Sequence, residues 1–294
     1  MLHVLSTRSI SNQRLTTVWL NRIWDANIPL IEFYCARQHL DYRNKAQISE
    51  LAHWFRDAKL KVHSAHSPIH NDEARGLSGP SSHISITEPV KAKRIQMVDE
   101  IKRAIDISET IPFTYFIQHM GTEFEEFDER KIDSAFTALE ELNIFARQRG
   151  VEILLENMNS GMASAERLYH FNSVTHLNLN YCLDTGQANL GNGVEAEYEV
   201  LKPNVRMVHI HDNNGKEDSH LLPMEGSVDW RKVMHLLRRD TPNAALVLET
   251  SERLESADPL DDARRTFDKL ENLQPLQEEG REDEGRRSEK DKNR

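Results

Sequence analysis

Residues 129–156, ERKIDSAFTALEELNIFARQRGVEILLE, contain the unit that decides the fold. Apolar side chains recur at spacings of three and four over 129–149, which predicts an amphipathic helix. Gly150 follows, as expected of the glycine that ends a helix. The apolar run 151–156 comes next, and its length and composition are typical of a buried strand. The stretch therefore predicts a helix that leads directly into a strand.

The same alternation extends along the chain on both sides. Short runs rich in apolar or β-branched residues predict strands at 3–7, 29–34, 60–66, 113–119, 151–156, 178–184, 205–211 and 245–250. Helices are predicted between them, for example at 46–58, 88–110, 129–149 and 230–239. Strands that alternate with helices favour a parallel sheet covered by helices, and eight such strands favour an α/β fold that closes into a (β/α)₈ TIM barrel.

Length and composition agree with a single barrel domain. The chain has 294 residues, of which 38% are hydrophobic and 29% are charged. The segment 275–294 contains six basic and seven acidic side chains but no aromatic one, which predicts a disordered charged tail. We therefore expect one domain over residues 1–274, close to the roughly 250 residues that are typical of a TIM barrel.

Charge and cysteine content exclude several classes of protein. The chain has 37 basic and 48 acidic residues, a net charge of −11, which argues against a nucleic-acid partner. Two cysteines, Cys35 and Cys182, are too few for a disulfide scaffold or a thiolate zinc finger. No stretch approaches the roughly 18 apolar residues of a membrane helix, and the first ten residues lack the pattern of a secretion signal. We expect a cytoplasmic protein without a membrane partner.

Ionisable residues stand at the ends of the later predicted strands. These residues are His66, His119, Glu156, Asp184, His209, His211 and Glu249. In a closed parallel barrel these ends meet at one rim, where the active sites of TIM barrels lie. A charged side chain directly after an apolar run is costly to bury alone. We therefore expect these residues to form one site, near the long connections 67–87 and 212–229.

Three carboxylates and one imidazole in this set predict a metal ion. Glu156, Asp184 and Glu249 would repel one another around a common axis unless a cation lay among them. Side chains two residues apart on a strand share a face, so His209 and His211 both point inward. We predict that the three carboxylates and His209 bind Mn²⁺, Co²⁺ or Mg²⁺, with Zn²⁺ as the alternative. His211 is predicted to contact the substrate or to lie behind a ligand.

Four further residues have simpler interpretations. His66 or His119, each taken alone, is more often a hydrogen-bonded core or rim histidine than a metal ligand. Glu32 ends the second predicted strand and fits an active-site role and a structural role equally well. Cys182 is interpreted as a small apolar residue that faces the barrel interior.

At these residues the chain resembles the xylose isomerase-like TIM barrel superfamily, which holds sugar isomerases and epimerases, inosose dehydratases and zinc-dependent AP endonucleases. The resemblance covers essentially residues 1–273. Its most specific pieces are LEN at 155–157, LDTGQAN at 183–189, VHIHDNNGKEDSHLLPMEG at 208–226 and LET at 248–250. In the family the matching strand-end residues share one metal, which here implies Glu156, Asp184, His209 (with Asp212 as the acid three residues later) and Glu249.

The resemblance to the epimerase branch implies an activity as well. Glu156 and Glu249 would serve as general base and acid at the carbon beside a carbonyl, through an enediolate. Binding of substrate hydroxyls is implied for His66, His119, Gln187 and His211. His220 resembles the family's mobile-loop histidine and is expected to contact the substrate or a second ion. We thus expect a metal-dependent isomerase or epimerase of a sugar, sugar phosphate or polyol. The partner would be a carbohydrate, and a homo-oligomer is expected by analogy, since dimers and tetramers are common in the family.

Three alternatives stay open from the sequence. A keto-inositol dehydratase would expel a β-hydroxyl at the same site. An AP endonuclease would hold three zinc ions, and its additional ligands match His66, His119, Asp218 and His220, but Gln187 stands where that branch has a histidine. The last alternative is a metal- or sugar-binding protein without enzymatic activity.

Overall fold

The computed structural model describes residues 1–72, 82–123, 125–251 and 258–274. Within them eight parallel strands pair in sequence order, and the last pairs with the first, so that the sheet closes into a barrel. The strands are β1 (Leu2–Ser6), β2 (Leu30–Tyr34), β3 (Lys61–His66), β4 (Tyr115–His119), β5 (Glu152–Glu156), β6 (Asn180–Asp184), β7 (Val205–Ile210) and β8 (Ala245–Leu248). The predicted TIM barrel is therefore confirmed.

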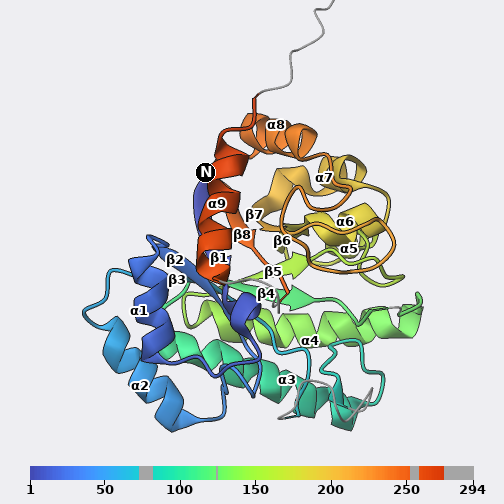
Figure 1. The fold of residues 1–294 in the computed structure, drawn as a ribbon. Coiled ribbons are helices and arrows are strands. Elements are labelled where there is room, and N and C mark those ends of the chain that lie inside the picture. The colour runs from blue at the N-terminus through green and yellow to red at the C-terminus, as the bar shows by residue number, and fades with distance from the viewer. Residues whose placement is uncertain (73–81, 124, 252–257, 275–294) are drawn as a thin grey trace, which may run out of the picture.

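Helices cover the outside of the barrel (Figure 1). They are α1 (Thr17–Asp25), α2 (Lys45–Phe55), α3 (Lys91–Ile105), α4 (Glu129–Arg147), α5 (Ala165–Val174), α6 (Thr185–Leu190), α7 (Val194–Leu201), α8 (Trp230–Asp240) and α9 (Pro259–Glu271). Short 3₁₀ helices lie at Thr7–Ile10, Asp106–Glu109 and Lys202–Asn204. Among the longer helices, α3 and α4 run alongside each other below the strands in this view.

The helix predicted at 88–110 is shorter than expected. The α-helix α3 covers Lys91–Ile105, and a 3₁₀ turn continues it over Asp106–Glu109. Val90 precedes the helix in an extended conformation and is 51% exposed, and Ile95 is 50% exposed, so neither apolar side chain belongs to the buried face of this helix, contrary to what the predicted helix 88–110 implies. At about 100° per residue, Ile95 is rotated by roughly 60–120° from the stripe's buried members, and it therefore faces solvent.

The helix-to-strand unit forms as the sequence predicts. The backbone N–H of Val151 donates to the carbonyl of Ala146 at 3.0 Å, and that of Gly150 donates to Arg147 at 3.1 Å. This pair of hydrogen bonds closes the end of α4 and needs a left-handed residue, which Gly150 supplies at φ 71°. The chain then enters β5 with Glu152.

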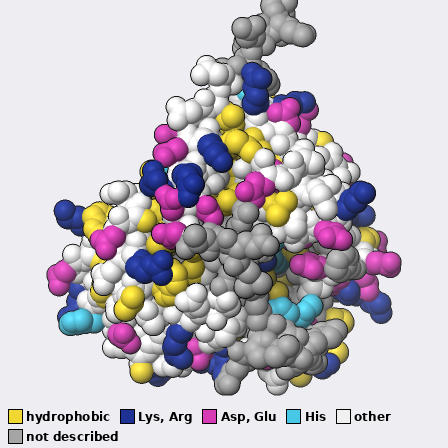
Figure 2. Space-filling view, in the orientation of Figure 1, with side chains coloured by type: hydrophobic (Ala, Val, Ile, Leu, Met, Phe, Trp, Pro, Cys, Tyr) yellow, Lys and Arg dark blue, Asp and Glu magenta, His cyan; other side chains and the backbone are white. Residues whose placement is uncertain are grey.

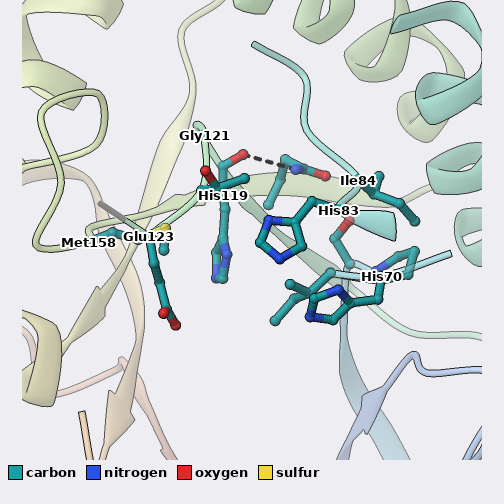
Figure 3. A pocket seen from close by; sticks show the side chains of 12 residues that line it. His70, His83, Ile84, His119, Gly121, Glu123 and Met158 are labelled. Atoms are coloured by element: carbon teal, nitrogen blue, oxygen red, sulfur yellow. Dashed lines mark hydrogen bonds between the residues drawn. The ribbon is translucent and has the colours of Figure 1, made fainter. Parts of the chain in front are cut away.

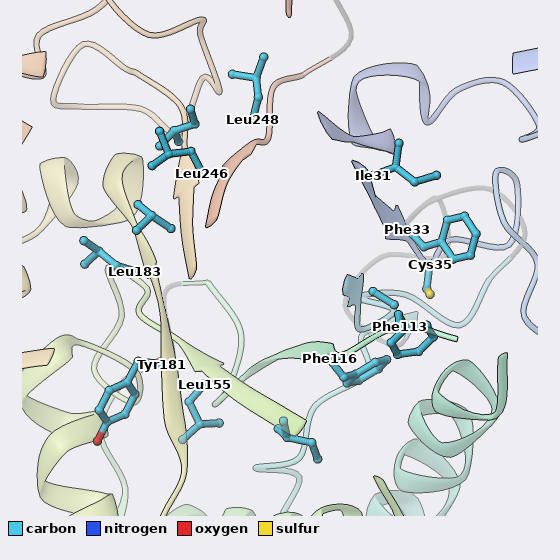
Figure 4. Packing of buried hydrophobic residues seen from close by; sticks show 14 of the residues in the cluster. Ile31, Phe33, Cys35, Phe113, Phe116, Leu155, Tyr181, Leu183, Leu246 and Leu248 are labelled. Atoms are coloured by element: carbon cyan, nitrogen blue, oxygen red, sulfur yellow. The ribbon is translucent and has the colours of Figure 1, made fainter. Parts of the chain in front are cut away.

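Side chains of the strands form two apolar layers. Outward-facing residues such as Phe33, Phe116, Leu155 and Tyr181 pack beneath the helices (Figure 4). A smaller inner cluster fills the barrel and consists of Val4, Ile117, Leu154, Cys182, Met207, Ala245 and Val247. The inward position predicted for Cys182 is confirmed. Because side chains alternate along β5, Glu156 faces inward two residues beyond Leu154, at the mouth of the barrel.

Two irregularities in strand pairing aim the site residues inward. Ile31 pairs with Val62, but Glu32 pairs with Ser64, so the register skips His63. In the same way the pairing of β6 with β7 skips one residue, and Cys182 then pairs with Met207 and Asp184 with His209. An extra residue of this kind reverses which face the following side chains occupy. Met207 and His209 lie two residues apart on β7 and share the inward face, which agrees with the prediction for His209.

Two predicted features lie partly or wholly beyond the described residues. The charged segment 275–294 and the middle of the connection 67–87 fall outside them. The connection 212–229 is described throughout. No described helix has the length and apolar character that crossing a membrane requires.

Candidate metal centre

Four strand ends bring the four predicted metal ligands together. Glu156 ends β5, Asp184 ends β6, His209 lies in β7, and Glu249 directly follows β8. One ligand atom from each residue lies within 4.8 Å of the other three, and all four side chains are buried. The convergence expected from a closed barrel is therefore present in the structure.

His209 lies at the centre of this cluster. Its Nδ1 is 2.5 Å from Oε1 of Glu156 and 3.3 Å from Oε2 of Glu249. Burial alone would lower the pKa of His209, but the neighbouring Cys182 sulfur and the carboxylates of Glu156, Glu32 and Glu249 raise that pKa well above its usual range. Burial alone would raise the pKa of Glu156, but the His209 and His119 imidazoles hold it well below its usual range. The buried carboxylates of the cluster are therefore stabilised by positive charge, which protons or a divalent cation can supply.

His66 and His119 lie on the other side of Glu156. Nε2 of His119 is 2.8 Å from Oε2 of Glu156, and Nε2 of His66 is 3.3 Å from the same oxygen. The two rings meet edge to face with centroids 4.9 Å apart. Both line the central cavity, where substrate hydroxyls were predicted to bind. Together with Glu156 they form a second group whose ligand atoms are close enough to hold an ion.

His211 lies behind Asp184. It is 0% exposed, and its Nε2 is 2.9 Å from Oδ2 of Asp184. Burial would lower the pKa of His211, but Asp184 outweighs burial and raises it to about 9. Of the two roles predicted for His211, this placement favours orientation of Asp184 over contact with the substrate.

Gln187 and His220 are linked through Asp218. Nε2 of Gln187 donates to Oδ2 of Asp218 at 2.7 Å, and Nε2 of His220 lies 3.2 Å from the same oxygen. Nδ1 of His220 donates to the carbonyl of Glu249 at 2.9 Å, and its ring stacks on His211 with centroids 3.8 Å apart. All three residues border the central cavity or its wall, so the structure brings them to the predicted site.

Asn157 positions Asp184, a function that was not predicted from the sequence. Its Oδ1 accepts the backbone N–H of Asp184 at 2.7 Å, and its Nδ2 donates to the Asp184 carbonyl at 3.1 Å. Nδ2 also donates to Oε2 of Glu197 at 3.0 Å. An amide is needed here because it can accept from the backbone N–H of a residue and donate to the carbonyl of the same residue at the same time. The asparagine directly after Glu156 in LEN was the available signal.

We expect Glu197→Gln to remove a pH-dependent loss of stability. Burial raises the pKa of Glu197 from its ordinary 4.5 to about 7. The folded protein therefore keeps this proton between about pH 4.5 and 7, where the unfolded chain has lost it, so stability falls as pH rises over that range and levels off above it. Relative to the unmodified protein, the variant should gain about 3 kcal/mol in urea unfolding at pH 8 and nothing at pH 4. Glu195→Gln, at an exposed position of the same helix, is the control and should show no such gain.

We expect Gly186→Ala to destabilise the protein although it places alanine in a helix. A Cβ at this position would lie 2.0 Å from Cε1 of His211, whose ring is fully buried. The clash should cost about 2 kcal/mol in thermal or urea unfolding, against a helix preference of up to about 1 kcal/mol in favour of alanine. In a His211→Ala background the same substitution should cost little; an equal cost there would contradict this explanation.

The central cavity has a volume of about 140 Å³. Besides the predicted residues it is lined by Arg8 and Tyr34, which were not predicted as site residues. One guanidinium nitrogen of Arg8 donates to the Tyr34 hydroxyl at 3.3 Å, and Nε lies 4.0 Å from Oε1 of Glu249. Arg8 closely follows β1 and Tyr34 ends β2, so their positions at the ends of strands were the signal from which they could have been predicted.

A second cavity of about 90 Å³ adjoins the first (Figure 3). The rings of His70, His83 and His119 and the side chain of Glu123 lie around it. His119, Glu123 and Met158 line both cavities, so the two form neighbouring parts of one depression at the rim.

The chain is similar in sequence to one protein family and in fold to several solved structures. Residues 22–273 match the protein family described as "Xylose isomerase-like TIM barrel". An uncharacterized protein of Methanocaldococcus jannaschii is 24% identical over 232 residues, which cover 74% of this chain and 73% of that protein. A D-tagatose 3-epimerase-like protein superposes with a TM-score of 0.74 at 21% identity, covering 93% of this chain and 97% of that one. The IOLI protein with a bound zinc atom gives 0.72 at 18% identity, covering 92% and 98%.

Proposed function

The chain belongs to the xylose isomerase-like TIM barrel family, and from this premise we propose that it is a divalent-metal-dependent isomerase or epimerase of a carbohydrate. The observation that supports the proposal most directly is the buried cluster of Glu156, Asp184, His209 and Glu249 at the mouth of the barrel. Solved structures with the same fold include a D-tagatose 3-epimerase-like protein and a zinc-bound protein.

The donor set of the cluster fits a divalent ion. Three carboxylates and one imidazole offer mainly oxygen ligands, which suit Mn²⁺, Mg²⁺ or Co²⁺, and Zn²⁺ also accepts such a set. Glu156, Asp184, His209 and Glu249 would hold the ion. When bound, it would supply Lewis acidity that polarises a substrate carbonyl.

The two glutamates are suited to proton transfer. Glu156 and Glu249 approach the central cavity from different strands, and both line it. One carboxylate would remove the proton from the carbon beside the carbonyl, leaving an enediolate, and the other would return a proton. Return to the opposite face of the same carbon gives an epimer, and return to the neighbouring carbon gives an isomer. His66 and His119 would donate hydrogen bonds to substrate hydroxyls.

The nuclease alternative has less support from the site. Both ends of the Gln187 amide are engaged, because Nε2 donates to Asp218 and Oε1 accepts the backbone N–H of Asn159 at 2.9 Å. Gln187 therefore replaces the histidine of the AP endonucleases with an amide that is already bonded. On the face shown in Figure 2, Lys and Arg side chains are interspersed with Asp and Glu, whereas nucleic-acid binding usually draws on a basic patch.

The proposal is tested by a screen of ketoses and keto-inositols in D₂O with Mn²⁺, Co²⁺ and Mg²⁺. We expect one substrate to gain deuterium at the carbon beside its carbonyl as the epimer or isomer appears, and Asp184→Ala to lose both the ion and the exchange. A product lighter by one water would replace the proposal with a dehydratase. Stoichiometric metal without exchange in any compound, or cleavage of an abasic DNA duplex with zinc, would also overturn it.

A further inference from the structure

Glu32 is a buried carboxylate behind the candidate metal centre. It lies in β2, is 0% exposed, and pairs in register with Ser64 of β3. Its Oε2 accepts the Ser64 hydroxyl at 2.9 Å and lies 3.2 Å from Nε2 of His209. Its Oε1 has no hydrogen-bond partner among the described residues. A carboxylate with an unpaired oxygen is costly to bury, and packing alone gives no reason to keep one here.

The orientation of His209 connects Glu32 to the centre. Nδ1 of His209 faces Glu156 and Glu249, while Nε2 on the far side of the ring faces Glu32. A neutral imidazole carries its proton on one nitrogen and a lone pair on the other. A proton donated from Nε2 to Glu32 therefore leaves the Nδ1 lone pair directed at the two glutamates.

The geometry points to Glu32 as a positioning residue that fixes the tautomer and ring orientation of His209 and so increases the affinity of the centre for a divalent ion. This inference rests on the proposed function, because it concerns the same metal. Carboxylates that accept the N–H on the non-ligating nitrogen of a metal-bound histidine are a recurrent feature of metal sites. Their loss lowers metal affinity by roughly 10- to 100-fold.

The strand pairing shows how the fold builds this contact. The register between β2 and β3 skips His63, and the skip brings Ser64 opposite Glu32 on the inward face. Ser64 then holds the oxygen that meets His209. A local irregularity of this kind re-aims a side chain without disturbing the rest of the sheet.

Direct metal titration tests the inference without relying on turnover. Mn²⁺ and Zn²⁺ are titrated separately into the metal-free full chain and into Glu32→Gln, which keeps the shape of the side chain and removes its charge. We expect the Kd of the variant to be roughly 10- to 100-fold higher for both ions. Ser64→Ala, which only frees the Glu32 carboxylate, should show a smaller increase. Glu100→Gln, at a buried carboxylate that pairs with Arg43, is the control and should bind as the unmodified protein does.

The protonation of His209 gives a second readout. With ¹⁵N-labelled histidine and Zn²⁺ bound, NMR should find the His209 proton on Nε2 in the unmodified protein, in a strong hydrogen bond to Glu32, and a weaker hydrogen bond of that proton in Glu32→Gln. Equal metal affinity and the same Nε2–H signal in both proteins would overturn the role of Glu32 and leave the proposed function standing. An unmodified protein that binds neither ion would overturn both. Tight binding that depends on Glu32, without turnover of any carbonyl sugar, would overturn only the proposed function.

Discussion

Glu156→Gln and Glu249→Gln are each expected to fold and to lose at least about 10³-fold in kcat/KM. A general acid or base contributes roughly 10²- to 10⁴-fold to a rate, and each glutamate is also a proposed metal ligand. Glutamine keeps the size of the side chain, so circular dichroism and gel filtration should match the unmodified protein. The measurement is turnover of the substrate that the D₂O screen identifies, with metal content determined in parallel.

Glu152→Gln is the matched control for this pair. Glu152 starts the strand that Glu156 ends, and the two lie on the same face at opposite ends of the barrel. Its carboxylate accepts from the Asn180 amide, away from the site, so turnover should be unchanged. Full activity in either Glu156→Gln or Glu249→Gln would refute the assigned acid and base roles.

Asp212→Asn is expected to cost about 3 kcal/mol of folding stability, because two donors to a buried carboxylate lose their acceptor. Asp212 is 0% exposed, and both its oxygens are fully used. Oδ1 accepts the backbone N–H groups of Asn213 and Val228, and Oδ2 accepts that of Met224 and the Trp230 indole at 2.7 Å. An asparagine would turn an N–H group toward one of these pairs of donors.

Urea unfolding measures this loss of stability. The loss also concerns the site, because Asp212 organises the connection 212–229. Asp212 ties both ends of the connection together, and Asp218 and His220 lie between them. Asp229→Asn is the control, because Asp229 caps α8 at an exposed position and asparagine caps equally well. A midpoint for Asp212→Asn equal to that of the unmodified protein would show that the carboxylate does not organise this segment.

The sequence predicted the strands and the ligand cluster more successfully than the residues that surround and position those ligands. Strand ends such as Glu156 and Asp184 are visible because a charged residue after an apolar run is rare without a purpose. Asn157 and Arg8 also lie just after strands, but a polar residue in a connection is ordinary, so their position alone did not single them out. From the sequence Glu32 fitted an active-site role and a structural role equally well, and its short distance to His209 favours the active-site role.

The alternation of apolar runs, the helix stop at Gly150 and the inward carboxylates are properties of local sequence, because periodicity and backbone preference act over a few residues. They determined the barrel and the rim at which its chemistry lies. Only the tertiary structure decided that the register skips His63, that His211 stands behind Asp184, and which nitrogen of His209 faces the glutamates. These features depend on contacts between segments far apart in the chain, and a shift of one residue in strand pairing reverses the face that a side chain occupies.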